Sequence, residues 1–412
     1  MKPQLNRRRF LRLGALAGIV SGFPVRAADT LQAQDDPGHI GDDGVKRYVR
    51  LGRTGLEIAD ISFGSSRLRN GEEYLVRHAL DKGVNYFDTA DSYTGGTSEQ
   101  VIGNALKGVR DRVFIASKMK VQPYTRRQDM MQSLEQSLRR LQTDYVDIFF
   151  NHAVNDVDRL KNPEWFEFLD RAKQQGKLRF SGISGHAGRL VECLDYGLDE
   201  DMLDVILVAY NFGQDPAFYE NLTRSFDFVA KQPDLPRVLE KAKRRDVGVI
   251  TMKVLRGAKL NDMRPYEKGG ATFAQAAFRW TLSDANVDAA IISMTSRDEI
   301  DEYLGGSGGM QVSRVDVELL EQYARLTHTT YCRHACNDCE GACPWGVPIA
   351  DVLRTRMYAT DYGDMEFARR EYARLGNGAS PCLSCDGQPC QNACTHGIPI
   401  ADLCGPTHTL LG

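Results

Sequence analysis

The sequence predicts an α/β protein in which a (β/α)8 barrel is followed by a small cysteine-rich domain. Between residues 60 and 305, short apolar runs alternate with amphipathic stretches at intervals of roughly thirty residues. Eight such runs favour a parallel sheet that closes into a barrel, because parallel strands need a long crossover between them. Nine of the ten cysteines lie between Cys332 and Cys404, so a cysteine-rich tail follows a cysteine-poor body.

The composition is that of an ordinary globular protein. The 412 residues are 42% hydrophobic and 26% charged, with a net charge of −3. This slight acidity gives no sign of a nucleic-acid partner, which a basic patch would mark. Beyond the first thirty residues, no stretch is long and apolar enough to span a membrane. The mature protein is therefore expected to have no membrane span.

The first thirty residues have the layout of an export signal. The basic stretch Arg7–Arg12 precedes the apolar run Leu13–Phe23, and Val25–Ala27 offers small residues to a signal peptidase. The segment NRRRFLR is similar to a twin-arginine signal. We expect residues 1–27 to be this signal peptide and residues 28–45 to be a linker. The twin-arginine export machinery is then a partner and the periplasm the location; a basic tail on a cytoplasmic protein is the alternative.

The predicted barrel occupies residues 46–328. Its candidate strands are Ile61–Phe63, Asn85–Phe87, Val113–Ala116, Tyr145–Phe150, Leu178–Ile183, Val205–Ala209, Gly248–Met252 and Ala289–Ile292. Arg126–Leu141 has apolar residues at helical spacing, and YVRLGRTGLEIA reads as a hairpin that closes the barrel bottom. A doubly wound open sheet is the alternative, although no glycine-rich dinucleotide fingerprint follows any of these strands.

Polar side chains follow three successive strands. Asp88 and Tyr93 follow the second strand, Lys118 the third and His152 the fourth, which is the catalytic face of such a barrel. We expect the Lys118 ammonium to lower the pKa of Tyr93, Asp88 to hold Lys118, and His152 to orient a substrate oxygen. Any one of these residues, taken alone at a strand end, would more often have a structural role than a catalytic one. Together they predict a general acid aimed at a carbonyl oxygen while hydride reaches the carbonyl carbon.

Three segments that carry these residues resemble the aldo-keto reductases: GVNYFDTADSYTGGTSEQVIGNALK, VFIASK and DIFFNH. The resemblance covers about residues 46–328 and implies a carbonyl or alcohol substrate, with NADP(H) or NAD(H) bound across the barrel mouth. It implies Tyr93 as the general acid, Lys118 and Asp88 as its supports, and His152 as the substrate-orienting residue. The cofactor-binding residues that it implies are Gly64, Ser65, Ser184, Met252, Lys253, Leu255, Ser293, Thr295 and Ser296.

The sequence departs from this family at positions that bind the cofactor. Gly185 and Leu207 stand where family members usually place an asparagine and a glutamine for the nicotinamide amide. Glu299 stands where many NADPH-binding members place an arginine, and its carboxylate would repel a 2′-phosphate. These departures count against tight nicotinamide binding, and more strongly against NADP(H) than against NAD(H).

The tail, residues 329–412, holds two similar groups of cysteines. They are Cys332, Cys336, Cys339 and Cys343, and then Cys382, Cys385, Cys390 and Cys394. Three closely spaced cysteines and a fourth three residues further on are typical of [4Fe–4S] sites in bacterial ferredoxins. We therefore expect an α-helical, ferredoxin-like domain with two [4Fe–4S] clusters. Disulfides and zinc are the alternatives.

The two halves of the tail are expected to share their ligands. In two-cluster ferredoxins the fourth cysteine of each motif binds the other motif's cluster. One site would then take Cys394 with the first three cysteines, and the other would take Cys343 with Cys382, Cys385 and Cys390. After each motif, a (V/I)PIAD segment is expected to lead into a helix. The whole layout is similar to a subset of aldo-keto reductases with a carboxyl-terminal 4Fe–4S domain.

Two functions agree with these features. The first is an oxidoreductase of aldo-keto type that reduces a carbonyl or oxidises an alcohol at Tyr93, coupled to iron–sulfur clusters. The second is a periplasmic electron-transfer protein or subunit, in which the clusters serve a redox protein partner and the barrel does not bind nicotinamide. The complete set of four catalytic candidates favours the first.

Overall fold

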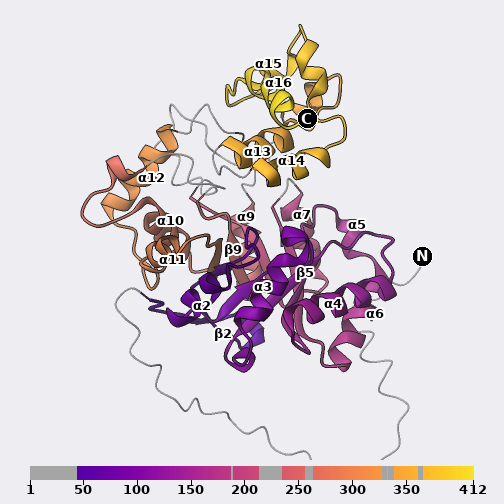
Figure 1. Cartoon of the computed structure of the whole chain (residues 1–412), viewed down its shortest axis with the longest axis vertical. Coiled ribbons are helices and arrows are strands. Elements are labelled where there is room, and N and C mark those ends of the chain that lie inside the picture. Colours follow the sequence, from indigo (N-terminus) through magenta and orange to yellow (C-terminus); the bar gives the residue numbers. More distant parts are fainter. Residues whose placement is uncertain are drawn as a thin grey trace, which may run out of the picture.

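The computed structural model describes residues 44–186, 189–212, 234–255, 263–326, 332, 338–360 and 365–412. The expected signal peptide, most of the linker and Cys336 lie outside these ranges. The described residues form a barrel followed by a helical carboxyl-terminal region, with α13 (Ile349–Thr360) and α14 (Met365–Ala373) nearest to the barrel (Figure 1). Among the described helices, none has the length and apolar character needed to cross a lipid bilayer.

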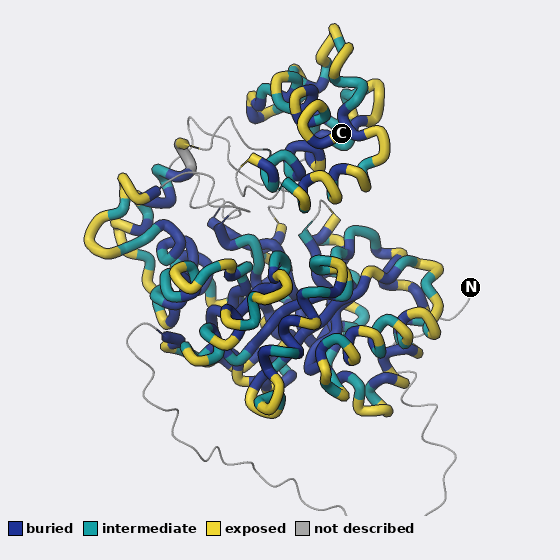
Figure 2. Tube along the Cα trace, in the orientation of Figure 1, coloured by how far each residue is buried: buried dark blue, intermediate teal, exposed yellow. Residues whose placement is uncertain are grey.

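Eight parallel strands close into a barrel in the order β10-β3-β4-β5-β6-β7-β8-β9. The strands are β3 (Ile61–Gly64), β4 (Tyr86–Asp88), β5 (Phe114–Met119), β6 (Val146–Asn151), β7 (Leu178–Gly185), β8 (Val205–Ala209), β9 (Gly248–Met252) and β10 (Ala289–Ser293). Most of their residues are buried, because helices cover the outside and side chains fill the inside (Figure 2). The predicted (β/α)8 barrel is confirmed, and the open sheet is wrong.

Helices surround the barrel. They are α2 (Glu73–Asp81), α3 (Thr97–Ala105), α4 (Arg127–Leu141), α5 (Val157–Leu160), α6 (Pro163–Gln174), α7 (Leu190–Asp199), α9 (Leu235–Arg244), α10 (Phe273–Leu282), α11 (Arg297–Leu304) and α12 (Arg314–Leu326). Helix α4 buries Met130, Leu134 and Leu138 at the predicted helical spacing. Helix α6 begins where the Asn162 side chain accepts a hydrogen bond from the Glu164 amide, and this cap fixes its start.

A hairpin closes the bottom of the barrel, as predicted. Strands β1 (Tyr48–Arg50) and β2 (Glu57–Ala59) pair antiparallel. Leu51 and Ile58 are fully buried, and they pack with side chains that point into the barrel, Phe150 and Leu207 among them. The barrel therefore has a solid floor, and only its other end is available for a site.

The carboxyl-terminal region has a hydrophobic core of its own, built on α13, α14, α15 (Pro389–Ala393) and α16 (Ile400–Leu411). Its two halves repeat the same local backbone. The amide of Gly346 donates to the Cys343 carbonyl at 3.2 Å, and the amide of Gly397 donates to the Cys394 carbonyl at 3.2 Å. Both glycines have left-handed φ values, 61° and 63°, which a side chain would strain. Each (V/I)PIAD segment then enters a helix, α13 or α16, as predicted.

Candidate active site

The four predicted catalytic residues meet at the open end of the barrel. Asp88 ends β4, Tyr93 opens the 3-10 turn Tyr93–Gly96, and His152 directly follows β6. Lys118 lies within β5 and pairs in register with Phe150 of β6, although we expected it just after the strand. The prediction ended β5 at the first polar residues. The strand continues because the charge of Lys118 is paired inside the barrel.

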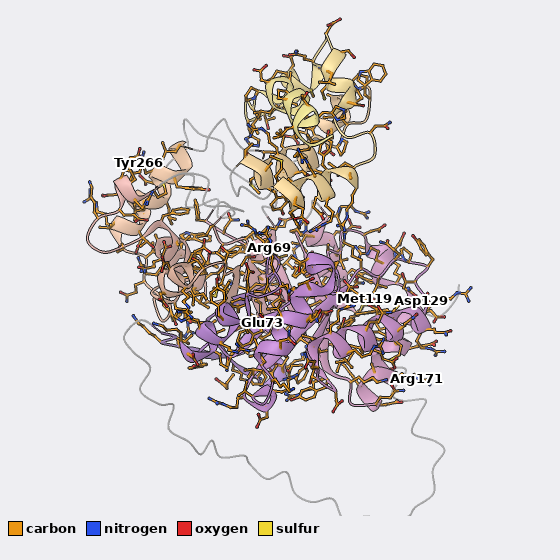
Figure 3. The ribbon with its side chains drawn as sticks, viewed as in Figure 1. Arg69, Glu73, Met119, Asp129, Arg171 and Tyr266 are labelled. Carbon is orange, nitrogen blue, oxygen red and sulfur yellow. The ribbon has the colours of Figure 1, made fainter. Side chains whose placement is uncertain are left out.

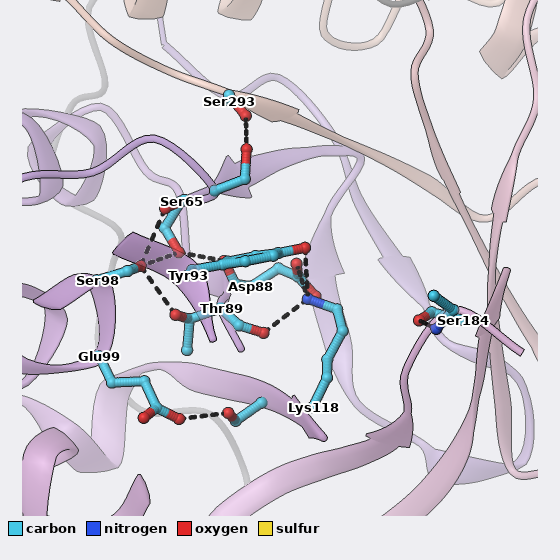
Figure 4. Close-up of polar contacts among 12 residues, drawn as sticks. Ser65, Asp88, Thr89, Tyr93, Ser98, Glu99, Lys118, Ser184 and Ser293 are labelled. Carbon is cyan, nitrogen blue, oxygen red and sulfur yellow. Dashed lines mark hydrogen bonds and ion pairs between the residues drawn. The ribbon is translucent and has the colours of Figure 1, made fainter. Parts of the chain in front are cut away.

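Lys118 is the centre of this group (Figure 4). Its Nζ forms an ion pair with Asp88 Oδ1, donates a hydrogen bond to the Thr89 carbonyl at 2.6 Å and lies 3.5 Å from the Tyr93 hydroxyl. The Lys118 and Asp88 side chains are only 1% and 2% exposed. Burial by itself would lower the pKa of Lys118, but Asp88 and Tyr93 outweigh it and raise that pKa. Lys118 therefore stays a cation at neutral pH.

The Tyr93 hydroxyl keeps its proton at neutral pH. Burial raises the pKa of Tyr93 above its usual value of 10.0; Lys118 opposes this shift and Asp88 adds to it. Lys118 lowers the pKa of Tyr93 as we expected, but the loss of water around the phenol outweighs the cation, so the net shift is upward. A protonated phenol is still the form that can give a proton.

His152 lies against Tyr93 and is neutral. The two ring centroids are 5.7 Å apart, and the rings meet edge to face at 81°. Burial, and then the nearby Lys118, Lys120 and Arg159, lower the pKa of His152 well below its usual value. Its Nδ1 is buried and has no hydrogen-bond partner within the part of the chain that the structure describes. A buried polar atom of this kind is typical of a binding site.

A second layer that sequence reasoning missed holds β5 in place. Glu99 is fully buried in α3, accepts a hydrogen bond from Ser117 Oγ at 2.6 Å and pairs with Arg140 of α4 at 2.6 Å. Ser117 precedes Lys118 and points to the opposite side of the strand. The sequence feature that could have revealed this layer is a single glutamate on the apolar face of α3. A buried glutamate needs a polar partner.

Gly64 and Ser65, expected near a cofactor, have structural partners. A Cβ on Gly64 would lie 2.8 Å from the Ile292 backbone, so the close approach of β3 to β10 requires glycine. Ser65 Oγ donates to the Asp88 carbonyl at 2.7 Å and accepts from Ser98 Oγ at 2.7 Å. Ser65 is 1% exposed and helps to fix the end of β4.

The departures from the family after β7 and on β8 also have physical reasons. Ser184 Oγ accepts a hydrogen bond from the Ala153 amide at 3.2 Å, which anchors the turn after His152. A Cβ on Gly185 would lie 2.5 Å from Leu190 Cδ1 and 3.0 Å from the Val154 carbonyl oxygen, so an asparagine there would require Leu190 to move. Leu207 is fully buried in the apolar interior of the barrel.

In the segment after β10, Glu299 forms hydrogen bonds with Thr295 and Ser296. The Thr295 amide and hydroxyl donate to Glu299 Oε2 at 3.0 and 2.6 Å, and Ser296 Oγ caps α11 by accepting from the Glu299 amide at 3.1 Å. Ser293 Oγ lies 2.7 Å from Ser66 Oγ across the ends of β10 and β3. A carboxylate therefore occupies the helix N-terminus, where a phosphate would otherwise be favoured.

The segment after β9 places a strained lysine at the barrel mouth. Lys253 has a φ of 61°, a left-handed value that is uncommon for a lysine, and Asn211 Nδ2 donates to its carbonyl at 3.2 Å. Burial, and then Arg354 of α13, lower the pKa of Lys253 to about 7, while Asp351 opposes them. The neighbouring Met252 is partly buried against the barrel interior, and Leu255 is 4% exposed in the outer core.

The cysteines of the tail gather in two places. Cys332, Cys339 and Cys394 line one pocket, together with Ile349, Leu353, Ile398, Ile400, Asp338 and His396. Cys343, Cys382, Cys385 and Cys390 form the other group: burial raises the pKa values of Cys382 and Cys390, and the other thiols of the group raise them further. Within the described ranges, no three His, Cys, Asp or Glu side chains are arranged to hold a single metal ion.

Cys404, which belongs to neither of the two cysteine motifs, lies between these two groups. Burial is the main cause of its raised pKa, and Cys382 and Cys390 of one group and Cys339 and Cys332 of the other add to it. Cys193 lies in α7 of the barrel, far from the tail cysteines in the sequence. It is buried, and burial raises its pKa to about 11. The raised pKa means that Cys193 stays a thiol, in keeping with a packing role.

The ion pair between Lys118 and Asp88 gives the first prediction. Replacing Lys118→Met leaves a buried carboxylate without its cation, so we expect the free energy of unfolding to fall by about 3–5 kcal/mol. The double variant D88N/K118M removes both charges and should recover most of that loss. Urea denaturation measures both variants, with the exposed Lys161→Met as the matched control. Equal stability of K118M and K161M would show that the pair does not hold the barrel together.

Known proteins resemble this chain over the barrel. A model of the aldo/keto reductase family matches residues 61–267. L-galactose dehydrogenase of Arabidopsis thaliana is 26% identical over 311 residues, which cover 66% of this chain and 91% of that protein. L-glyceraldehyde 3-phosphate reductase of Escherichia coli strain K12 is 25% identical over 325 residues, 68% of this chain and 93% of the relative.

A solved structure agrees with this match. The aldo-keto reductase from Klebsiella pneumoniae in complex with NADPH has a TM-score of 0.51 and 24% identity, and the match covers 68% of this chain and 95% of that one. At 24% identity, this structural similarity is evidence about the fold alone. The family model adds the sequence evidence, since it spans half of the chain and includes Asp88, Tyr93, Lys118 and His152. The chain belongs to the aldo/keto reductase family of oxidoreductases.

Proposed function

We propose that the protein reduces a small carbonyl compound to an alcohol, or catalyses the reverse oxidation, with Tyr93 as general acid and base. One observation carries the proposal: Tyr93 is half-buried, its hydroxyl lies 3.5 Å from the Lys118 ammonium, and its ring meets the His152 ring edge to face. This arrangement can deliver a proton to one point at the barrel mouth and stabilise the charge that is left behind.

Each residue has a defined part in the reaction. Reduction adds a hydride to the carbonyl carbon and a proton to its oxygen. Tyr93, which is protonated at neutral pH, gives that proton, and Lys118 stabilises the resulting phenolate. Asp88 keeps Lys118 charged. The neutral His152 orients the substrate oxygen by a hydrogen bond. In the reverse direction the Tyr93 phenolate takes the proton from the alcohol.

The residues present fit NAD(H) better than NADP(H). A nicotinamide, when bound, supplies or accepts the hydride. The Glu299 carboxylate lies at the N-terminus of α11, where it accepts hydrogen bonds from Thr295. A carboxylate accepts hydrogen bonds from ribose hydroxyls and repels a 2′-phosphate. Gly185 and Leu207 offer no amide for the nicotinamide, so binding is expected to be weaker than is usual in the family.

The two cysteine groups support two [4Fe–4S] clusters, with the shared ligands that the spacing predicted. Cys394 joins Cys332 and Cys339 in one apolar pocket, and Cys343 joins Cys382, Cys385 and Cys390 in the other group. Four thiolates that bind four different irons are spaced more widely than four around one ion. Such clusters carry one electron at a time, and we propose that they exchange electrons with a redox protein partner.

The start of the chain supports export, because residues 1–27 combine a basic stretch, an apolar run and small residues near Ala27. We propose that the folded, cluster-loaded protein crosses to the periplasm by the twin-arginine route. Cluster insertion before export would protect the thiols from forming disulfides in an oxidising compartment.

Substituting Tyr93→Phe tests the reaction. The variant keeps the ring but loses the proton, so kcat for reduction of a small aldehyde by NADH should fall by about 10²–10⁴-fold. Because the pKa of Tyr93 lies above 10.0, the wild-type rate of reduction should hold through neutral pH. The exposed Tyr124→Phe is the matched control. Unchanged turnover in Y93F would assign the chemistry elsewhere, and a wild-type protein that reduces no carbonyl would favour the electron-transfer alternative.

The nucleotide preference follows from Glu299. Wild-type protein should bind NADH more tightly than NADPH, and E299Q should narrow the difference by about tenfold by removing the repulsion. Glutamine can still accept the hydrogen bonds of Thr295, so the start of α11 should stay intact. Fluorescence titration with both nucleotides measures the ratio, and Asp298→Asn removes the same charge from the neighbouring residue as a control. If D298N changes the ratio as much as E299Q, then Glu299 is not the determinant.

The proposed assignment of the cysteines to two clusters predicts how much iron a cysteine substitution removes. Protein prepared without oxygen should contain iron and acid-labile sulfide, and Cys390→Ser should lower the iron content by about half while leaving the other site filled. Cys193→Ser, which alters a buried cysteine of the barrel, should change nothing. Chemical iron analysis and electron paramagnetic resonance follow the loss. A wild-type protein that holds zinc or disulfides in place of iron would overturn the assignment.

A further inference from the structure

The turn that carries His152 is held by the neighbouring strands. Ala153, the next residue, has a φ of 52°, a left-handed value that is uncommon for a residue with a side chain. The His152 amide donates a hydrogen bond at 2.8 Å to the carbonyl of Met119, which ends β5 (Figure 3). The amides of Ala153 and Val154 donate to the side chain and the carbonyl of Ser184 at 3.2 and 2.8 Å. Strands β5 and β7 therefore bind the amides of the turn, and its carbonyls need another partner.

Arg159 is that partner. It lies in the short helix α5, which begins where the Asp156 side chain accepts a hydrogen bond from the Asp158 amide at 3.0 Å. Arg159 Nη1 donates to the Ala153 carbonyl at 2.6 Å, and Nη2 donates to the His152 carbonyl at 2.8 Å. One guanidinium thus fixes the peptide groups on both sides of the left-handed residue.

The same side chain ties the turn to its surroundings. Nη2 of Arg159 also donates to Asn151 Oδ1 at 2.9 Å, and Nε donates to the Val121 carbonyl at 2.6 Å. Four of the five N–H donors of the guanidinium are therefore used. Arg159 is only 8% exposed. A buried guanidinium must have its donors bonded, so the acceptors have to stand where its planar fork reaches them.

Arg159 also contributes its charge to the site. Its four acceptors are uncharged carbonyl oxygens, so none of them neutralises the cation. Burial is the main cause of the lowered pKa of His152, and Lys118, Lys120 and Arg159 lower it further. The side chain that fixes the turn therefore also helps to keep the imidazole neutral.

An arginine at the other end of the barrel has a comparable set of bonds. Arg110 donates four hydrogen bonds of 2.8–3.1 Å where β5 and β6 begin, to Val113, Thr143, Tyr145 and Asp147. It joins the two strands far from their carboxyl ends, where the proposed catalytic residues lie. Arg110 is therefore a matched reference for an arginine whose role is structural alone.

We propose that Arg159 is a positioning residue of the active site: it holds the left-handed turn at Ala153 and thereby sets the direction of the His152 ring toward the substrate oxygen. The proposal rests on the reaction proposed above, in which His152 orients that oxygen. The hydrogen bonds of Arg159 end on protein carbonyls, so it acts through His152. The His152 ring meets Tyr93 edge to face, and a displacement of about 1 Å at such a site can cost about 10²-fold in rate.

Kinetics of the full-length, cluster-loaded protein test the proposal. R159M should lower kcat/KM for a small aldehyde with NADH by about 10²-fold, whereas R110M should keep the wild-type value. R159K keeps the buried charge and is the variant to use if R159M does not fold. It should still lose about tenfold, because a single ammonium cannot replace the planar fork. Equal kcat/KM in R159M and R110M, or full activity in R159K, would overturn the proposal.

A double-mutant cycle shows whether Arg159 acts through His152. H152Q removes the imidazole, so adding R159M to it should cost no more than adding R110M. A further loss of about 10²-fold in the H152Q background would mean that Arg159 acts by another route, which would contradict the proposal.

Crystal structures test the position without the reaction. Compared with the wild-type crystal structure, R159M and R159K should show Ala153 outside the left-handed region and the His152 ring displaced from Tyr93, whereas R110M should show neither change. An unmoved His152 in R159M would overturn the proposal. A displaced His152 in R159M, in a protein whose wild type reduces no carbonyl, would sink the proposed reaction and leave the control of His152 by Arg159 standing.

Discussion

The buried pair of Lys118 and Asp88 is the interaction on which the active end of the barrel depends. It lets β5 continue to Met119 with a lysine inside the barrel, it fixes the end of β4, and it gives the Tyr93 hydroxyl a cation at 3.5 Å. Neither charge would be stable there alone, since burial opposes both. The layer behind it, Glu99 with Ser117 and Arg140, keeps the strand that carries Lys118 in register. The geometry of the four proposed catalytic residues therefore follows from the need to pair one buried cation.

The same reasoning explains why the cofactor-facing segments differ from those usual in the family. Leu190 and the Val154 carbonyl crowd the space beside Gly185, and Ser184 accepts a hydrogen bond from the turn after His152. Leu207 fills the apolar interior above the floor formed by the β1–β2 hairpin. In each case packing within the barrel decides the residue. The four residues proposed for catalysis are all present, while the surface expected to face a nucleotide differs from that usual in the family.

The sequence was sufficient for the barrel, its eight strands and the four residues at its mouth, because strand periodicity and strand-end position carry that information. It misjudged the net shift in the pKa of Tyr93, since the extent of burial is a property of the packed site. It also gave no sign that Arg354 of the tail lies near enough to Lys253 and His186 of the barrel to lower their pKa values. Glu299 was recognised as a departure, but its closure on Thr295 needed coordinates.

Helix α13 borders both the cysteine pocket and the barrel. Ile349 and Leu353 line the pocket of Cys332, Cys339 and Cys394, while Arg354, the next residue along, lies near enough to Lys253 to lower its pKa. Neighbouring residues of a helix point to different faces, so one rigid element serves both surroundings. A change in the packing of the cysteine pocket would therefore also move a positive charge relative to Lys253.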